Sequence, residues 1–209
     1  RIVPDGDDLV TENNTQSLAF EVVDRPLRAL YLDGYPRWER RYLTALLLRE
    51  PSIASSSLML ATDRRFIQEG DVNLAVLPRS AEEWAEFDVV ILGDLRADLF
   101  SAEQLENLRT HIAERGAGLL LIAGPGAMPR GWAESPLADL LPVAVASGGI
   151  AERFDTPVTL SPTPLADRLG LLRFEPVDIA DPALGWTNLR YAQRYSDGEI
   201  KPAAEELAA

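Results

Sequence analysis

The chain has 209 residues, and 46% of them are hydrophobic, which is enough to build a substantial core. Its 33 acidic and 20 basic residues give a formal net charge of -13, which disfavours binding to nucleic acid or anionic lipid because both need clustered cations. It has no cysteine, which excludes disulfides, thiolate metal sites and cysteine nucleophiles, and no apolar run approaches the roughly 20 residues that cross a bilayer.

Residues 1–25 differ from the remainder of the chain. After an Asp-rich start, Leu18, Phe20 and Val22 alternate with polar residues, which predicts a β-strand. This strand either pairs with the main sheet or closes a preceding domain. We favour the second, because the segment resembles the closing strand of bacterial immunoglobulin-like adhesion modules. The expected organisation is therefore a truncated preceding domain with its linker at 1–25 and an α/β domain at 26–209, both part of a longer polypeptide.

From residue 27 onward the pattern alternates between strands and helices. An apolar strand at 27–32 ends in Asp33-Gly34, and a helix follows over 37–49, apolar nearly all round in its last two turns. We expect this helix to pack deeply, with Trp38, Tyr42 and Leu46 in the core. A short second strand is predicted at 57–61, and a long polar loop at 63–79.

The middle of the chain carries the clearest signals. A capping box predicts a helix over 80–87, and the continuous apolar run at 88–92 predicts a strand in the interior of a parallel sheet. A second capping box opens a helix over 101–115, followed by a strand at 118–123 and a short helix at 137–141. Short strands and turns, including a strand at 157–160, are expected beyond Val145. The pattern predicts an α/β fold, a three-layer, doubly wound, mostly parallel sheet of flavodoxin-like type.

Ligands bind beyond the carboxyl ends of the strands in such a sheet. The predicted ends are the three loops at 33–38, 94–98 and 123–130. The residues that we expect to line this candidate binding edge are Asp33, Tyr35, Arg37, Glu39, Asp94, Gly124 and Gly126.

Two of these strand ends carry a family resemblance. The run Asp88-Val-Val-Ile-Leu-Gly-Asp94, a helix ending in Gly116, and the run Gly118-Leu-Leu-Leu-Ile-Ala-Gly-Pro-Gly126 resemble the core of the class I glutamine-amidotransferase-like superfamily, with its DJ-1, PfpI and trehalose-utilisation branches. Asp33-Gly-Tyr-Pro-Arg-Trp-Glu39 further resembles a branch found in large bacterial membrane-anchored proteins. The resemblance covers about 27–145. It implies a glutamine-amidotransferase-like domain on the extracytoplasmic, periplasmic side.

The resemblance also implies where a nucleophile would lie. Active relatives carry a cysteine on the turn after the second strand, activated by a histidine. The corresponding position here is about Ala123, and the only histidine, His111, falls within the preceding helix, where we expect a structural or surface role. No catalytic residue is therefore assigned.

Other site chemistries stay open. Gly124 and Gly126 suggest either a phosphate cradle or, as we favour, a plain tight turn. Asp33 and Asp94 suggest either a Mg²⁺ site or ordinary turn and cap residues. Ser135 or Ser147 could replace the missing nucleophile only with a nearby histidine.

Two function classes follow. The favoured hypothesis is a non-catalytic interaction or sensory module with no cofactor, whose partners are other domains of the same polypeptide or envelope proteins. The alternative is a metal- or carboxylate-dependent hydrolase that uses Asp33, Glu39, Asp94 and Arg37. Convergent, unpaired carboxylates would favour the hydrolase, whereas carboxylates paired with Arg37 or Arg40 would favour the module.

Overall fold

The computed structural model describes residues 24–60, 66–74, 76–144, 151–172, 189–193 and 200–208. The strand predicted within residues 1–25 falls almost entirely outside this part of the chain. Ser147 also lies outside it. The proposed domain boundary near residue 25 therefore stays a prediction.

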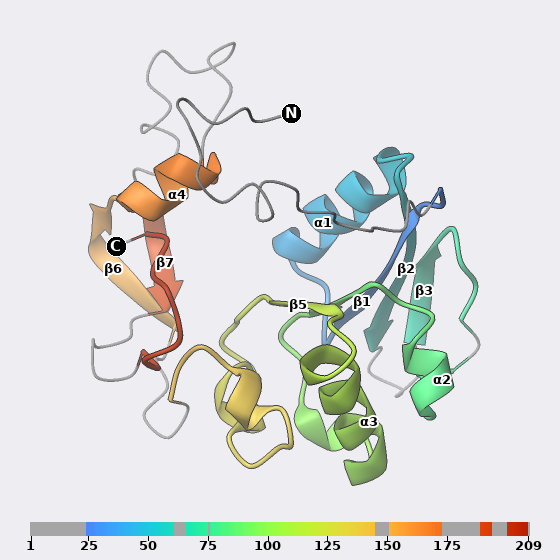
Figure 1. The fold of residues 1–209 in the computed structure, drawn as a ribbon. Helices are drawn as coiled ribbons and strands as arrows, with labels where there is room; N and C mark the ends of the chain where they lie inside the picture. Colours follow the sequence, from blue (N-terminus) through green and yellow to red (C-terminus); the bar gives the residue numbers. More distant parts are fainter. Residues whose placement is uncertain are drawn as a thin grey trace, which may run out of the picture.

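A five-stranded sheet organises the described residues (Figure 1). Its strands lie in the order β3-β2-β1-β4-β5, and all neighbours are parallel except β2 and β3. The fold is therefore α/β, as predicted. The strand bounds are β1 Leu27–Asp33, β2 Ile53–Leu60, β3 Phe66–Gly70, β4 Val89–Leu92 and β5 Gly118–Leu121.

Helices cover both faces of this sheet. The helix α1 (Trp38–Arg49) packs on one face, and α2 (Ala81–Trp84) and α3 (Ala102–Ala113) pack on the other (Figure 1). Both predicted capping boxes are present, because Ser80 caps α2 and Ser101 caps α3. These caps satisfy N–H groups that a helix leaves unpaired in its first turn.

The two faces bury very different amounts of apolar surface. On the α2 and α3 side, sixteen buried side chains form one cluster that includes Leu30, Val90 and Leu108. Among the described residues, the cluster on the α1 side has four buried members, namely Ala29, Tyr31, Leu47 and Ile91. The face under α1 is therefore the thinly covered one.

Two strand predictions were wrong in extent. The strand β2 begins at Ile53, before the predicted start at residue 57, and it includes three buried serines that all have partners: Ser55 bonds Asp71, Ser56 accepts from Gln68, and Ser57 bonds Thr44 at 3.0 Å. Part of the segment predicted as a polar loop is β3, which pairs antiparallel with β2 along the sheet edge. The hydrophobic pattern did not predict these strand segments because their residues are largely polar.

The remaining described elements are short. After β5 come 3₁₀ turns at Arg130–Trp132 and Ala138–Leu140, the second replacing the helix predicted at 137–141. The strands β6 (Ala151–Val158) and β7 (Leu189–Gln193) form a separate two-stranded sheet, with α4 (Pro164–Leu169) between them in sequence. No helix in the described part of the chain is long and apolar enough to cross a membrane.

Candidate functional site

The carboxyl ends of β1, β4 and β5 meet at one edge of the sheet. Backbone bonds continue the strand pairing into this edge, from Gly93 N–H to the Leu32 carbonyl and from Ile122 N–H to the Leu92 carbonyl, both at 2.8 Å. Asp33 and the loops that start at Gly93 and Ile122 therefore lie at the same edge, as the sequence predicted. What these side chains do there decides between the two function classes.

Asp33 ends β1 and is fully buried. Its carboxylate accepts three hydrogen bonds: from the Tyr31 hydroxyl at 2.5 Å, the Gly34 N–H at 2.8 Å and the Arg37 Nε at 2.9 Å. Burial of the Tyr31 phenol, reinforced by its bond to Asp33, raises the pKa of Tyr31. A buried carboxylate is stable only when it is paired and hydrogen-bonded, and Asp33 meets both conditions within the chain.

Arg37 binds the Asp33 carboxylate and also the backbone that follows β5. Its Nη1 donates to the Ala123 carbonyl at 3.1 Å and its Nη2 to the Ile122 carbonyl at 3.0 Å. Burial works against the guanidinium charge, but the bond to Asp33 and its charge outweigh burial, so the pKa of Arg37 is raised. One side chain thus ties the β1–α1 loop to the end of β5.

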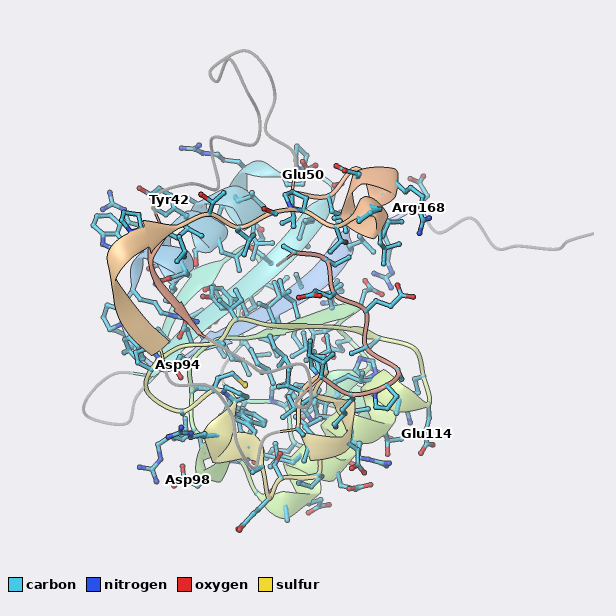
Figure 2. The ribbon with its side chains drawn as sticks, turned by 90° about the vertical axis from the view of Figure 1, so that its left-hand side faces the viewer. Tyr42, Glu50, Asp94, Asp98, Glu114 and Arg168 are labelled. Carbon is cyan, nitrogen blue, oxygen red and sulfur yellow. The ribbon has the colours of Figure 1, made fainter. Side chains whose placement is uncertain are left out.

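Asp94 follows β4 and occupies the second half of the edge. Its carboxylate accepts bonds from the backbone N–H groups of Gly126 and Ala127, both at 2.6 Å, and of Met128 at 2.8 Å, and from the Tyr35 hydroxyl at 2.7 Å. Burial alone would raise the pKa of Asp94, but these four bonds outweigh it and hold that pKa below its ordinary value. Figure 2 shows Asp94 between the α1 layer, marked by Tyr42, and the α3 layer, marked by Glu114.

The loop after β5 therefore does form an anion cradle, and the anion is Asp94. Successive N–H groups that converge on one point are the arrangement that binds phosphate in nucleotide-binding loops. Here the carboxylate of the same chain fills it, so the expectation of a plain tight turn was incomplete. A Cβ at Gly124 would overlap the Asp94 carboxylate, and one at Gly126 would lie 3.0 Å from it. Glycine at both positions lets the cradle close on Asp94.

Tyr35 and Gly93 complete the packing of the edge. Burial, followed by the bond to Asp94, raises the pKa of Tyr35 to about 12, so its hydroxyl stays a hydrogen-bond donor at neutral pH. At Gly93 a Cβ would lie 2.5 Å from Asp33 Cγ and 2.7 Å from Arg37 Nη2, so no side chain fits between the pair and β4.

The position that resembles a nucleophile site has no such geometry. The Ala123 carbonyl is bound by Arg37, and the residues described between β5 and residue 144 form 3₁₀ turns and no α-helix. His111 is buried and its Nε2 lies 2.8 Å from the Phe87 carbonyl, which precedes β4. Of the two roles expected for His111, structural or surface, its burial favours the structural one, and it lies at the opposite edge of the sheet from Ala123.

The remaining predicted residues divide between surface and structure. Glu39 is exposed on α1. Ser135 donates to the Trp132 carbonyl and has no histidine beside it in the described structure. The expectation that Trp38, Tyr42 and Leu46 belong to the core was wrong: they are 65%, 67% and 59% exposed. The reason is geometric, because the side of α1 that contacts the sheet carries Arg40, Thr44 and Leu47.

Asp94 has no vacant coordination position, and Asp33 is fully buried among its internal donors. The four bonds to Asp94 use its full capacity of about four lone pairs, and Asp33 accepts three bonds. A Mg²⁺ ion would have to displace these donors. Among the described residues, no three His, Asp or Glu side chains gather as a metal site. The sequence reading missed the contributions of Tyr31, Ala127 and Met128, two of which act only through backbone N–H groups.

Arg40, the other cation near this edge, is a poorly paired buried group. Its side chain is 9% exposed, its Nη1 lies 3.6 Å from Glu69, and its Nε and Nη2 have no partner among the described residues. An unsatisfied buried donor costs about 1–3 kcal/mol, more than the pair with a half-exposed Glu69 returns. We expect Arg40→Met, which keeps the stem packing, to raise the free energy of unfolding by about 1 kcal/mol in urea titrations. The matched control is Arg41→Met on the exposed face of α1, expected within about 0.5 kcal/mol of the parent, and a clear loss with Arg40→Met would contradict this account.

Comparison with protein-family models and with curated protein sequences finds no match to this chain. A functional assignment has to come from the geometry of the edge.

Proposed function

We propose that this chain is a non-catalytic interaction or sensory module built on a glutamine-amidotransferase-like scaffold. The observation that carries the proposal is the closed edge: Asp33 and Arg37 pair with each other, and Asp94 fills the cradle of the loop after β5. The groups that would bind a ligand in an open α/β edge are engaged within the chain. The chain also has no cysteine to act as a nucleophile.

The strand order supports the finer part of this fold proposal. The parallel strands follow the order β2-β1-β4-β5, so the chain moves outward in both directions from β1, as in a flavodoxin-like doubly wound sheet. The antiparallel β3 at the edge is compatible with such folds, many of which carry one antiparallel edge strand. An envelope location, with partners among other domains of the same polypeptide or envelope proteins, is proposed from the resemblance alone.

The alternative of a carboxylate- or metal-dependent hydrolase draws less support from the contacts. A general acid or base must exchange a proton with substrate, but Asp94 is saturated by four internal donors, and Asp33 is fully buried and ion-paired with Arg37. Glu39, the third acidic group of that hypothesis, lies exposed on α1, where no described contact directs it to Asp33 or Asp94.

The direct test is hydrolysis of glutamine. We expect the purified chain to release no ammonia above the buffer blank, with or without added Mg²⁺ or Zn²⁺. The variant Ala123→Cys restores a thiol at the position implied by the resemblance, and it too should be inactive, because His111 lies at the other edge of the sheet. A glutaminase of known activity serves as the positive control. Ammonia release by the unmodified chain would disprove the proposal.

A further inference from the structure

The outward face of α1 is apolar, which is unusual for a helix on the surface of a domain. Surface helices bury one apolar stripe and present polar residues to water. Here Trp38, Tyr42 and Leu46 are all more than half exposed, and Trp38 stacks on Tyr42 with ring centroids 6.0 Å apart. Exposed aromatic and aliphatic groups that gather on one element mark an interaction site.

The spacing of this face is symmetric along the helix. Trp38, Tyr42, Ala45 and Arg49 are separated by four, three and four residues, so they lie in one line opposite the buried Arg40, Thr44 and Leu47. The intervals of four, three and four residues are the same when they are counted from either end of the helix.

The charges on this face are balanced, unlike those of the chain as a whole. Arg41 and Arg49 are offset by Glu39 and Glu50, whereas the chain carries a net charge of -13. Two copies that approach each other through other surfaces repel each other on average, because both are negatively charged. The charges on the α1 face cancel, so contact through this face adds no such repulsion. Figure 2 shows Tyr42 of α1 and Glu50, directly after this helix, on the opposite side of the sheet from Glu114, which follows α3.

We propose that the outward face of α1 is the interface through which two copies of this chain associate, with the two α1 helices antiparallel. In that arrangement Trp38 of one copy lies level with Arg49 of the other, and Tyr42 lies over the small Ala45. The first contact is a cation–π pair of the kind that Arg41 already makes with Trp38 within the chain, at 5.5 Å. The second places a large side chain against a small one, as in helix pairs that pack closely. Glu39 near one end and Arg49 near the other end of α1 come within reach of each other across the pair.

This inference rests on the proposed role as an interaction module and names its partner. The association should be weak, because a 12-residue helix is only about 18 Å long and buries less than a standard interface. Sedimentation velocity of the whole chain, from about 10 μM to 1 mM, should show a concentration-dependent shift from the 22.9 kDa monomer to a dimer.

The structure offers a matched pair of leucines for the test. Leu46 and Leu169 are both 59% exposed and both lie on helices, but only Leu46 is on the proposed interface. We expect Leu46→Ala and Tyr42→Ala each to raise the concentration for half-dimerisation at least about tenfold, and Leu169→Ala to leave it unchanged. Unfolding midpoints of all three variants check that the fold is intact.

The orientation has its own test, since the chain has no native cysteine. Under mild oxidation, a mixture of the single variants Tyr42→Cys and Ala45→Cys should form the mixed disulfide faster than Ala45→Cys alone forms its own, although the mixed pair has lost one Tyr42 side chain and the Ala45→Cys pair keeps both. A preference for the like pairs would contradict the antiparallel arrangement. A chain that stays monomeric at about 1 mM, or a dimer that Tyr42→Ala and Leu46→Ala leave unchanged, would overturn the proposal. Neither outcome depends on glutamine hydrolysis, so the two proposals fail independently.

Discussion

The variant Asp94→Asn is expected to lower the free energy of unfolding by about 3 kcal/mol, a large share of the 5–15 kcal/mol that stabilises a typical domain. An amide of the same shape has one oxygen that accepts bonds, and its NH₂ group faces donors where the carboxylate had a second acceptor. At least one of the three backbone N–H groups at Gly126, Ala127 and Met128, or the Tyr35 hydroxyl, then loses its partner in a buried place. Urea unfolding measures the loss.

The matched control is Asp98→Asn. Asp98 pairs with Arg96 on an exposed surface, where ion pairs contribute about 0–1 kcal/mol, so this variant should unfold close to the parent (Figure 2). Tyr35→Phe removes a single bond to Asp94 and should cost about 1 kcal/mol, which gives a graded series if Asp94→Asn does not fold. Equal stability of Asp94→Asn and Asp98→Asn would show that the cradle does not need its carboxylate.

The pH dependence of the stability difference between the parent and Asp94→Asn gives a second test of the cradle. The folded-state pKa of Asp94 lies below its ordinary value of 3.8, so the stability that this carboxylate contributes is fully present above that value and is lost as the pH falls through the folded-state pKa. The difference in unfolding free energy between the parent and Asp94→Asn should therefore be constant near neutral pH and shrink below about pH 4. A difference that grows on acidification would have the wrong sign for a carboxylate held by hydrogen bonds.

Much of the sheet could be predicted because its strands and caps leave local signals. The apolar run of β4 and the Ser101–Gln104 capping box are each readable within a few residues, and both are confirmed. The strand β3 was missed because it is short, polar and at the edge, where its pairing with β2 supplies most of the order. A local pattern carries no information about a partner strand ten residues away.

The sequence predicted where Asp33 and Asp94 lie, but it did not predict what their side chains bind. Strand ends locate Asp33 and Asp94 at one edge, as parallel topology requires. Three of the four donors that saturate Asp94 lie more than thirty residues later in the chain, and these three are backbone N–H groups, which almost any residue type supplies. Side-chain identity therefore could not reveal that the cradle after β5 is already filled.

The outward face of α1 was misread for a different reason. A helix with apolar residues all round is normally enclosed, and that rule placed Trp38, Tyr42 and Leu46 in the core. The described sheet face offers α1 only one contact side, so the other apolar side remains exposed. The apolar pattern correctly indicates that the outward face of α1 is suited to contact with another protein surface. It does not indicate whether that surface belongs to the same chain or to another.

Arg37→Ala is expected to cost about 3–5 kcal/mol of unfolding free energy, because it leaves the fully buried Asp33 carboxylate without a cation and two carbonyls of the β5 end without a donor. Arg37→Lys should recover less than half of this loss, since a compact ammonium cannot reach Asp33, Ile122 and Ala123 together as a planar guanidinium does. Arg41→Ala, on the exposed side of the same helix, is the control, expected within about 0.5 kcal/mol of the parent. In an Asp33→Asn background, Arg37→Ala should cost about 2 kcal/mol less than in the parent, which measures the coupling between the two groups.

The sign of the Arg37 effect also separates the two function classes. Residues that serve a substrate are often held at a cost in stability, so their removal leaves a protein as stable as before or more stable. An arginine whose role is to close the sheet edge has the opposite signature, with a loss of stability and faster amide exchange at Gly124 and Gly126 as the loop after β5 is released. A gain of stability with Arg37→Ala would mean that Arg37 and Asp33 are held for a ligand. The carboxyl edge would then again be the first place to look for chemistry.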